Sequence, residues 1–271
     1  MKIGTKRWNR VARRPLADVL EELRTADTLA FDEVRPDILV MSVNRPHRGN
    51  SQTVEMFGEL AWAAATLRTA HLRTLIITGA GGKAFCTGFD LDEVDALTTM
   101  TVPEFTDLIE TAASVSTGLR GLPYPVIAAV SGPAAGGGLS LALAADIRVA
   151  DETASFSAGF VRIGLSIGEL GTSWNLARLI GSGRAAELAY TGRTARAAEA
   201  MRIGLVDRLT DADTALEAAL EMAETIAENS WEGVRSTKNA LVRNMENDSL
   251  RSALEIDTRG QALNLRQAES R

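Results

Sequence analysis

The sequence has a single cysteine, Cys86, and only two histidines, His47 and His71, among its 271 residues. One cysteine cannot form an internal disulfide, and such scarcity is typical of proteins from a reducing compartment. Structural zinc sites use about four nitrogen and sulfur ligands, so these three residues do not predict one, and we expect no bound metal. The histidines are expected in loops or on the surface, and Cys86 is expected to be a buried structural thiol.

Long hydrophobic runs are also absent. The most apolar region, residues 126–143, is interrupted by glycine and proline and is not expected to cross a bilayer. The basic segment 1–14 lacks the apolar core of a secretory signal peptide. The net charge of −6 argues against general affinity for nucleic acid or for an anionic membrane. The composition, 45% hydrophobic and 24% charged, is typical of a soluble globular protein, for which we expect a cytoplasmic location.

The chain is organised around residues 125–146. This stretch predicts a buried strand, a tight turn at Gly132-Pro133, and a helix rich in leucine and alanine that begins at the glycine triplet 136–138. Free N–H groups at a glycine-rich helix start attract negative charge, either a phosphate or an oxyanion formed only during a reaction. Close packing of the strand and the helix, with no ligand, explains the glycines as well.

Strands and helices alternate along the rest of the chain, which favours an α/β fold with a helical end. Besides the central stretch, the patterns predict strands at 28–34, 38–43, 73–78 and 154–156. They predict helices at 16–24, 53–67, 102–118, 174–180 and 183–191, and an almost wholly helical region from residue 195, at 195–201, 212–229, 231–246 and 250–267.

Two glycine-rich loops, residues 79–90 and 132–138, each follow a strand. Together with other segments they resemble the enoyl-CoA hydratase/isomerase, or crotonase, superfamily. The matching segments stand in the family's order within residues 28–268: Asn-Arg-Pro-x-Arg-x-Asn (44–50), Gly-Ala-Gly-Gly-Lys-Ala-Phe-Cys-Thr-Gly-Phe-Asp-Leu (79–91), Ser-Gly-Pro-Ala-Ala-Gly-Gly-Gly-Leu-Ser-Leu-Ala (131–142), Ala-Asp-Ile-Arg-Val-Ala (145–150), Gly-Leu-Val-Asp (204–207) and Ser-Thr-Lys-Asn-Ala-Leu (236–241).

The resemblance implies an α/β fold of the crotonase-like (ClpP/crotonase) type, a spiral of ββα units with a C-terminal helical region. It divides the chain into an N-terminal extension (1–27), the spiral core (28–200) and a helical trimerisation region (201–271). It implies a homotrimer or a dimer of trimers, and an acyl-CoA thioester as substrate in fatty-acid or acyl-CoA metabolism. No cofactor is expected besides the coenzyme A thioester itself.

The same resemblance implies that two backbone N–H groups bind the thioester oxygen as it gains negative charge. Thr87 is the expected first donor and Gly137 the second, and each such donor stabilises the transition state by about 3 kcal/mol. Residues around the first donor are expected to line the pantetheine and thioester: Thr87, Gly88, Phe89 and Asp90. Asp90 is expected to cap the following helix. Arg48 lies in the loop that meets the CoA nucleotide, where a cation suits phosphate, and a solvated loop arginine is the alternative.

The chain departs from the family pattern at the two glutamates with which hydratases add water. Ser140 and Phe160 occupy these positions, and neither can act as a carboxylate base, although both are expected to contact the acyl group. Glu169 stands where the dienoyl-CoA isomerase branch has an aspartate before x-Gly-Thr. An apolar loop would raise its pKa, as a proton shuttle needs, and a salt-bridged loop carboxylate is the alternative.

These departures make double-bond isomerisation at least as well supported as hydration. A protein that binds acyl-CoA without catalysis is the alternative from another class, because fold does not fix function. A serine hydrolase is disfavoured although Gly-Leu-Ser-Ile-Gly (164–168) matches a nucleophile elbow, because both histidines precede the serine and no clear strand runs into it.

Overall fold

The computed structural model describes residues 13–168 and 170–268 of the chain. The strands are β1 (Leu29–Arg35), β2 (Ile38–Val43), β3 (Thr74–Gly79), β4 (Val126–Val130), β5 (Pro133–Ala135), β6 (Ile147–Asp151), β7 (Ser155–Ser157), β8 (Thr194–Arg196) and β9 (Arg208–Thr210). The α-helices are α1 (Leu16–Leu23), α2 (Val54–Leu67), α3 (Val94–Thr99), α4 (Val102–Arg120), α5 (Gly137–Ala144), α6 (Thr172–Ile180), α7 (Ser182–Thr191), α8 (Ala197–Ile203), α9 (Ala215–Ala227), α10 (Trp231–Asn244) and α11 (Leu250–Ala268). Short 3₁₀ turns are η1 (Pro46–Arg48), η2 (Leu91–Glu93) and η3 (Gly159–Ile163).

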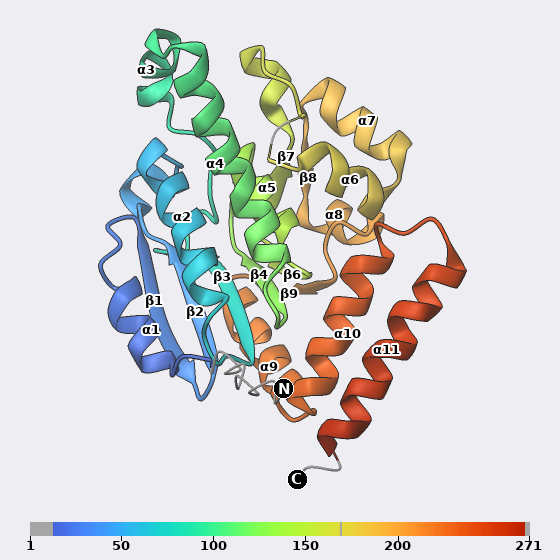
Figure 1. The fold of residues 1–271 in the computed structure, drawn as a ribbon. Coiled ribbons are helices and arrows are strands. Elements are labelled where there is room, and N and C mark those ends of the chain that lie inside the picture. The colour runs from blue at the N-terminus through green and yellow to red at the C-terminus, as the bar shows by residue number, and fades with distance from the viewer. Residues whose placement is uncertain (1–12, 169, 269–271) are drawn as a thin grey trace, which may run out of the picture.

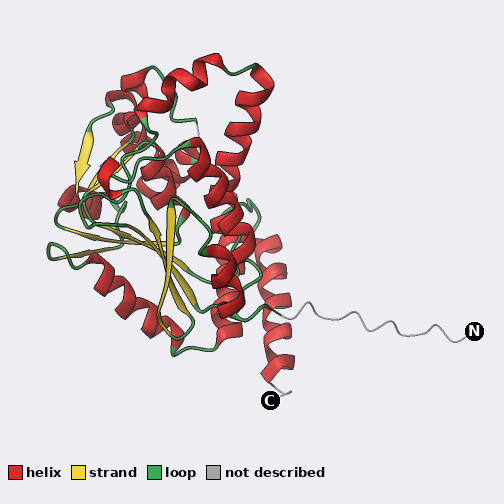
Figure 2. Cartoon of the chain, turned by 90° about the vertical axis from the view of Figure 1, so that its left-hand side faces the viewer, coloured by secondary structure: helices red, strands yellow, loops and turns green. Residues whose placement is uncertain are grey.

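A six-stranded sheet in the order β1-β2-β3-β4-β6-β9 forms the centre of the molecule (Figure 1). Only the edge strand β1 is antiparallel to its neighbour, and the remaining pairs are parallel. Parallel strands are usually covered on both faces, and Figure 2 shows helices on both sides of this sheet. A second sheet has three short strands in the order β5-β7-β8, and its strand β5 leads the chain from the end of β4 to the start of α5.

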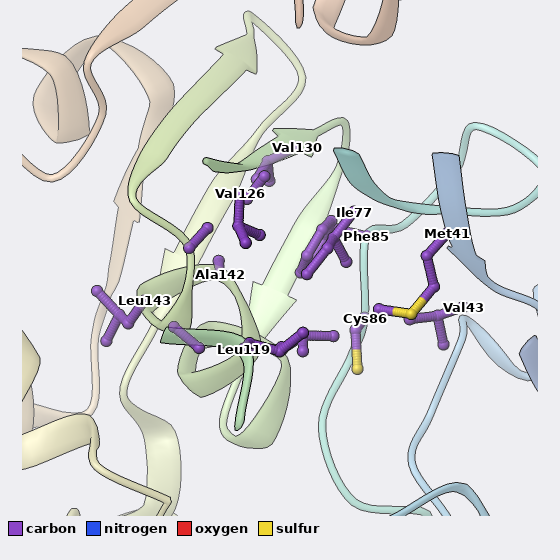
Figure 3. Close-up of a cluster of buried hydrophobic side chains, with 14 of the residues drawn as sticks. Met41, Val43, Ile77, Phe85, Cys86, Leu119, Val126, Val130, Ala142 and Leu143 are labelled. Carbon is purple, nitrogen blue, oxygen red and sulfur yellow. The ribbon is translucent and has the colours of Figure 1, made fainter. Parts of the chain in front are cut away.

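Successive residues of the central strands point to opposite faces of the sheet, so alternate residues belong to two different buried clusters. Ile38, Val40, Ile76 and Ile127 belong to the cluster that α9 covers. The residues between them face the larger cluster, which also contains side chains of α1, α2 and α4: Leu39, Met41, Leu75, Ile77, Val126 and Ala128. In Figure 3, Phe85 and Cys86 lie among these side chains, next to Ile77 and Met41.

Most predicted elements are confirmed with boundaries shifted by three residues or fewer, including α1, α2, α4, β1 to β4 and α6 to α11. The prediction of an almost wholly helical region from residue 195 is confirmed for α8 to α11 but misses two short strands, because β8 ends at Arg196 and β9 joins the large sheet beside β6. The sequence patterns do not predict strands β5 and β6 or helix α3. Three of the missed strands, β5, β8 and β9, have three residues each, which is too short to show an alternating pattern.

The predicted division of the chain at residues 27 and 200 does not follow the packing. Helix α1 buries Leu16, Val19, Leu20 and Leu23 in the main core, although it lies in the expected extension. Helix α9 packs on the large sheet, so the core continues to about residue 227. Within the ranges 13–168 and 170–268, no helix combines the length and apolar character needed to cross a membrane.

Helix α10 is attached to the core through an ion pair whose lysine is buried and whose aspartate is partly exposed. The Lys238 Nζ lies 2.7 Å from Asp146 Oδ2 and donates to the Tyr124 carbonyl at 2.9 Å. Asp146 Oδ2 also accepts the Val126 N–H at 2.8 Å, at the start of β4. Burial lowers the pKa of Lys238, and the nearby carboxylate opposes this effect. The motif Ser-Thr-Lys-Asn-Ala-Leu therefore has a structural role in docking α10.

We expect Lys238→Ala to lower the free energy of unfolding by about 3 kcal/mol, because it leaves the Asp146 carboxylate without its buried cation. Urea denaturation at neutral pH measures this loss. Lys83→Ala is the matched control, since Lys83 is exposed, and it should change stability by less than about 0.5 kcal/mol. Equal stability of the two variants would show that this ion pair does not hold α10.

Candidate active site

Two chain segments that are distant in sequence meet at the carboxyl ends of β3 and β4. Cys86 forms an isolated parallel β-bridge with Ala134. The Cys86 N–H donates to the Pro133 carbonyl at 3.1 Å, and the Cys86 carbonyl accepts the Ala135 N–H at 3.0 Å. The loop after β3 is thereby held beside the stretch that enters α5.

Glycines permit this contact because there is no space for side chains between the two backbones. A Cβ atom on Gly138 would lie 2.0 Å from the Cys86 carbonyl oxygen. A Cβ atom on Gly88, whose φ is +95°, would lie 2.8 Å from the Ala135 oxygen and 3.6 Å from the Gly137 nitrogen. The alternative of close packing therefore accounts for part of the glycine pattern, and the same packing brings Gly88 next to the start of α5.

The structure corrects the expected first amide donor. The Thr87 N–H donates to the Gly49 carbonyl at 3.2 Å, so it is already paired within the protein. The Thr87 side chain also faces this loop, since a Cβ on Gly49 would lie 3.0 Å from Thr87 Cγ2. Thr87 thus supports the loop 45–50, and its amide is not free to bind a ligand.

Elimination along the same segment leaves one other amide. The Gly88 N–H interacts with the Cys86 sulfur, and the Asp90 N–H donates to the Gln52 carbonyl at 2.8 Å. For the Phe89 N–H, the residues that the structure describes provide no acceptor. The motif alone does not reveal this, because the acceptors of the Thr87 and Asp90 amides come from the loop before α2.

The Gly137 N–H lies in the first turn of α5, where amides have no partner within the helix. The preceding residue, Gly136, donates to the Ser157 carbonyl at 2.9 Å and accepts the Ser140 N–H at 3.0 Å. The helix dipole adds partial positive charge at this end. Among the described residues, Gly137 and Phe89 therefore offer two unpaired donors on neighbouring segments.

Asp90 joins the first of these segments to the loop before α2. Its carboxylate accepts from Arg45 at 2.9 Å, Arg48 at 3.0 Å and Ser51 at 2.9 Å, and it caps η2 through the Asp92 N–H at 3.2 Å. The predicted capping role is confirmed. The bond from Arg48 is the main reason that the pKa of Asp90 falls well below its usual range. Arg48 also pairs with Asp92, and its side chain remains 40% exposed at the surface.

An apolar cluster adjoins the segment that carries Phe89. The Phe57 and Phe89 rings are stacked with centroids 6.1 Å apart and an interplanar angle of 6°. The cluster draws its members from α2, the loop after β3, α3 and its C-cap, α4 and the loop before α6: Val54, Phe57, Phe89, Leu97, Met100, Leu108, Ala112 and Leu170. These side chains form an apolar wall beside the amide pair.

A family model described as enoyl-CoA hydratase/isomerase matches residues 33–271. The Bacillus subtilis protein YngF, described as "putative enoyl-CoA hydratase/isomerase", is 40% identical over 225 residues, which cover 82% of this chain and 84% of that protein. A monofunctional enoyl CoA isomerase from M. smegmatis has a solved structure with a TM-score of 0.72 and 38% identity, covering 84% of this chain and 98% of that one. A "putative enoyl-CoA hydratase" from Thermobifida fusca YX, solved in complex with CoA, has a TM-score of 0.81 and 31% identity, covering 93% and 98%.

The chain belongs to the enoyl-CoA hydratase/isomerase family. The predicted fold class and enzyme class are thereby confirmed. In this family member, both positions expected to hold hydratase glutamates are buried and carry no carboxylate. Ser140 Oγ lies 2.5 Å from Thr172 Oγ1 and 3.2 Å from the Gly136 carbonyl oxygen. Phe160, in η3, is 6% exposed.

The expected acid–base residue, Glu169, lies outside the described residues. Its neighbours are described and mark an unusual local backbone. Leu170 has a φ of +53°, which is rare for a bulky side chain. Its carbonyl accepts the Ser116 hydroxyl at 2.6 Å, and its side chain is buried in the apolar cluster. Such strain persists only where surrounding contacts hold it, and it is common near functional sites.

The remaining candidate groups have structural roles. Both histidines are exposed, as predicted. Cys86 is buried and free, and burial raises the pKa of its thiol to about 12. No strand enters the segment around Ser166, whose hydroxyl accepts the Gly168 N–H at 3.0 Å, so the resemblance to a hydrolase elbow is coincidental.

One group of carboxylates is compact enough to resemble a cation site. Oxygen atoms of Asp27, Glu55 and Glu59 lie within 4.8 Å of one another. Glu59 already accepts the Asp27 and Thr28 N–H groups, at 2.6 and 2.9 Å, and the other two residues are exposed. This group caps the start of β1, and we assign no metal to it.

Replacing Gly138 by alanine tests the contact between the two segments. We expect Gly138→Ala to lower the free energy of unfolding by about 3 kcal/mol, because its Cβ would overlap the Cys86 carbonyl. Gly183→Ala is the control, since a Cβ there meets nothing within 4 Å and alanine favours the helix by up to about 1 kcal/mol. Chemical denaturation of both variants measures the effect, and unchanged stability of Gly138→Ala would refute the close approach.

The lowered pKa of Asp90 gives a pH-dependent prediction. An aspartate of this kind stabilises the fold above its unfolded pKa, and the contribution disappears as the pH falls through the folded value. We expect Asp90→Asn to be about 2 kcal/mol less stable than the wild type at pH 7, with a gap that narrows below about pH 4. Urea unfolding at several pH values, from neutral pH to below about pH 4, measures the stability difference between the wild type and Asp90→Asn at each pH.

Asp92→Asn is the matched control for this pH series. The Asp92 side chain is 76% exposed, so its loss should change stability by less than about 1 kcal/mol. A gap between wild type and Asp90→Asn that stays constant from neutral to acid pH would contradict the assigned ion pairs.

Proposed function

We propose that this enzyme binds an acyl-CoA thioester beside the Phe89 and Gly137 amides and stabilises its enolate during a proton transfer. The observation that carries the proposal is the pair of unpaired amides, Phe89 and Gly137, on adjacent segments. A thioester oxygen gains negative charge when a proton leaves the α-carbon. Two preorganised N–H donors stabilise that charge strongly because they need no rearrangement.

The CoA part of the ligand would lie along the loop before α2. The relative from Thermobifida fusca with bound CoA supports a CoA thioester as the ligand class. Arg48 is the candidate for phosphate contact, since its guanidinium is partly exposed at the edge of this loop. Asp90 and Asp92 hold Arg48 in place, and a phosphate would displace the exposed Asp92 more easily than the buried Asp90.

The acyl group would extend from the amide pair along the apolar wall of Phe57, Phe89 and Leu170. Ser140 and Phe160 would line it without acting as bases. Glu169, adjacent to Leu170, is the proposed acid–base residue. For a 3-enoyl thioester, Glu169 would take a proton from C2, the electrons would delocalise onto the thioester oxygen, and the same proton would return to C4 as the double bond moves to C2–C3.

Double-bond isomerisation is the reaction we favour, and hydration is the second candidate because family members carry both names. The replacement of both hydratase glutamates also sustains a third possibility, an acyl-CoA binder without catalysis. Fatty-acid or acyl-CoA metabolism is the proposed setting, and a reducing, cytoplasmic location remains a prediction.

The proposed assembly is a trimer or a dimer of trimers. Large apolar side chains on α10, on the residue that follows it and on α11 are exposed in the single chain, which supports packing against another copy: Leu241, Met245, Leu250, Leu254 and Leu265. Figure 1 shows these helices side by side at one flank of the fold. Contacts between copies would bury this surface.

The proposed chemistry is tested by exchange of the α-protons of butyryl-CoA in deuterated water, followed by mass spectrometry, together with turnover of crotonyl-CoA and a 3-enoyl-CoA. We expect Glu169→Gln to slow exchange and isomerisation at least ~100-fold, because an amide cannot accept the proton. Binding of butyryl-CoA, measured by calorimetry, should be retained.

Glu152→Gln is the matched control, since Glu152 is an exposed turn residue and should leave all rates unchanged. Full activity of Glu169→Gln would show that another group moves the proton. Binding of every thioester without exchange or turnover by the wild type would establish the non-catalytic binder.

A further inference from the structure

Gln52 is held by its backbone to the segment that contains Phe89. It forms an isolated parallel β-bridge with Phe89. Its N–H donates to the Gly88 carbonyl at 2.7 Å, and its own carbonyl accepts the Asp90 N–H at 2.8 Å. These two bonds lie on either side of Phe89 and leave the Phe89 N–H facing the opposite direction.

The side chain of the same residue reaches the other segment. Gln52 Nε2 donates to the Gly137 carbonyl oxygen at 3.3 Å. Its Oε1 occupies the space where a side chain of residue 137 would begin, 1.9 Å from the position of an added Cβ. Gln52 is 2% exposed, and Oε1 is buried without a hydrogen-bond partner among the described residues.

The next residue fixes Gln52 to a rigid element. Thr53 caps α2 by accepting the Met56 N–H at 3.1 Å on its side chain. The Val54 N–H donates to Glu93 Oε2 at 2.8 Å. Gln52 therefore projects from the anchored start of a helix, and its side chain cannot follow a shift of α5 freely.

Burying an amide at this place has an energetic cost. An unpaired buried acceptor costs about 1–3 kcal/mol, whereas an apolar side chain of the same length would avoid this cost. Native proteins keep few such groups, and each calls for an explanation. A role in holding two functional amides explains why a glutamine is used here.

We propose that Gln52 is a positioning residue that sets the spacing between the Phe89 and Gly137 amides, so that one thioester oxygen can accept from both. It does so by binding the first segment through its backbone and the second through its side chain. This inference rests on the proposed function. It adds a residue that touches neither the substrate carbonyl nor the transferred proton.

Two substitutions separate this role from simple packing. Gln52→Met keeps the length and volume of the side chain but removes the donor to Gly137. Gln52→Glu keeps the shape and replaces the donor by a carboxylate, which would also repel the negative charge on the thioester oxygen. When that glutamate is protonated, its hydroxyl can again donate to the Gly137 carbonyl.

The decisive measurement is the infrared carbonyl band of bound butyryl-CoA labelled with carbon-13 at the thioester carbon. Hydrogen bonding to the oxygen lowers this frequency, so the band reports the amide pair without requiring turnover. We expect a clear lowering in the wild type and loss of at least about half of it in Gln52→Met. The α-proton exchange rate should fall about 10- to 100-fold, with little change in Kd.

The glutamate variant adds a pH signature that a structural role would not produce. Burial raises the pKa of a carboxyl group, so Gln52→Glu should become neutral as the pH is lowered. We expect the lowered carbonyl frequency to return in Gln52→Glu on acidification and to stay lost in Gln52→Met. Gln261→Glu, at an exposed position on α11, is the control and should behave as the wild type at every pH.

The outcomes distinguish this inference from the proposed function. If the wild type does not bind butyryl-CoA, or binds it without lowering the carbonyl frequency, the proposed thioester site fails and the role of Gln52 fails with it. If the wild type shows the lowering and folded Gln52→Met shows it equally, only the positioning role is overturned. Circular dichroism and thermal denaturation establish that each variant is folded before it is compared.

Discussion

Two backbone hydrogen bonds between Cys86 and the strand β5 hold the candidate site together. They join a loop that follows β3 to a segment that follows β4, and neighbouring parallel strands bring both to the same edge of the large sheet. The contact requires glycine at residues 88 and 138, because added Cβ atoms would strike backbone atoms at 2.8 and 2.0 Å. Everything proposed for the site follows from this approach of one main chain to another.

Polar side chains around this contact organise the backbone. Asp90 ties the first segment to Arg45, Arg48 and Ser51, and Gln52 spans both segments. A backbone amide that already donates within the protein cannot bind a ligand. Identifying the paired amides therefore shows which unpaired amides remain available to one. Away from the site, Lys238 attaches α10 to the core in a similar manner. Its buried ammonium group pairs with Asp146 and also donates to the Tyr124 carbonyl.

The large elements and the two glycine loops are predictable from the sequence, because helices such as α2 and α4 and strands such as β2 and β3 are long enough to show their period. The first donor is not predictable in this way. Thr87 and Phe89 lie two residues apart in one motif, and contacts with another segment make their amides different. The Gly49 carbonyl accepts from the Thr87 N–H, whereas Gln52 forms its hydrogen bonds with the residues on either side of Phe89. One feature of the sequence draws attention to Gln52, namely an amide side chain directly before the capping Thr53. Its hydrogen-bond partner Gly137 lies 85 residues away.

The distribution of proton-transfer groups limits the chemistry that the site could perform. Hydration of an enoyl thioester requires one group to activate water at C3 and a proton for C2. The hydroxyl of Ser140 is bonded to Thr172 and the Gly136 carbonyl, and Phe160 has no titratable group, so neither position could activate water. An isomerisation neither adds nor removes atoms, and a single carboxylate near C2 and C4 would suffice. The proposed site, with two amides positioned by buried polar groups and Glu169 as the proposed carboxylate, would therefore be better suited to moving a proton along the acyl chain than to adding water across it.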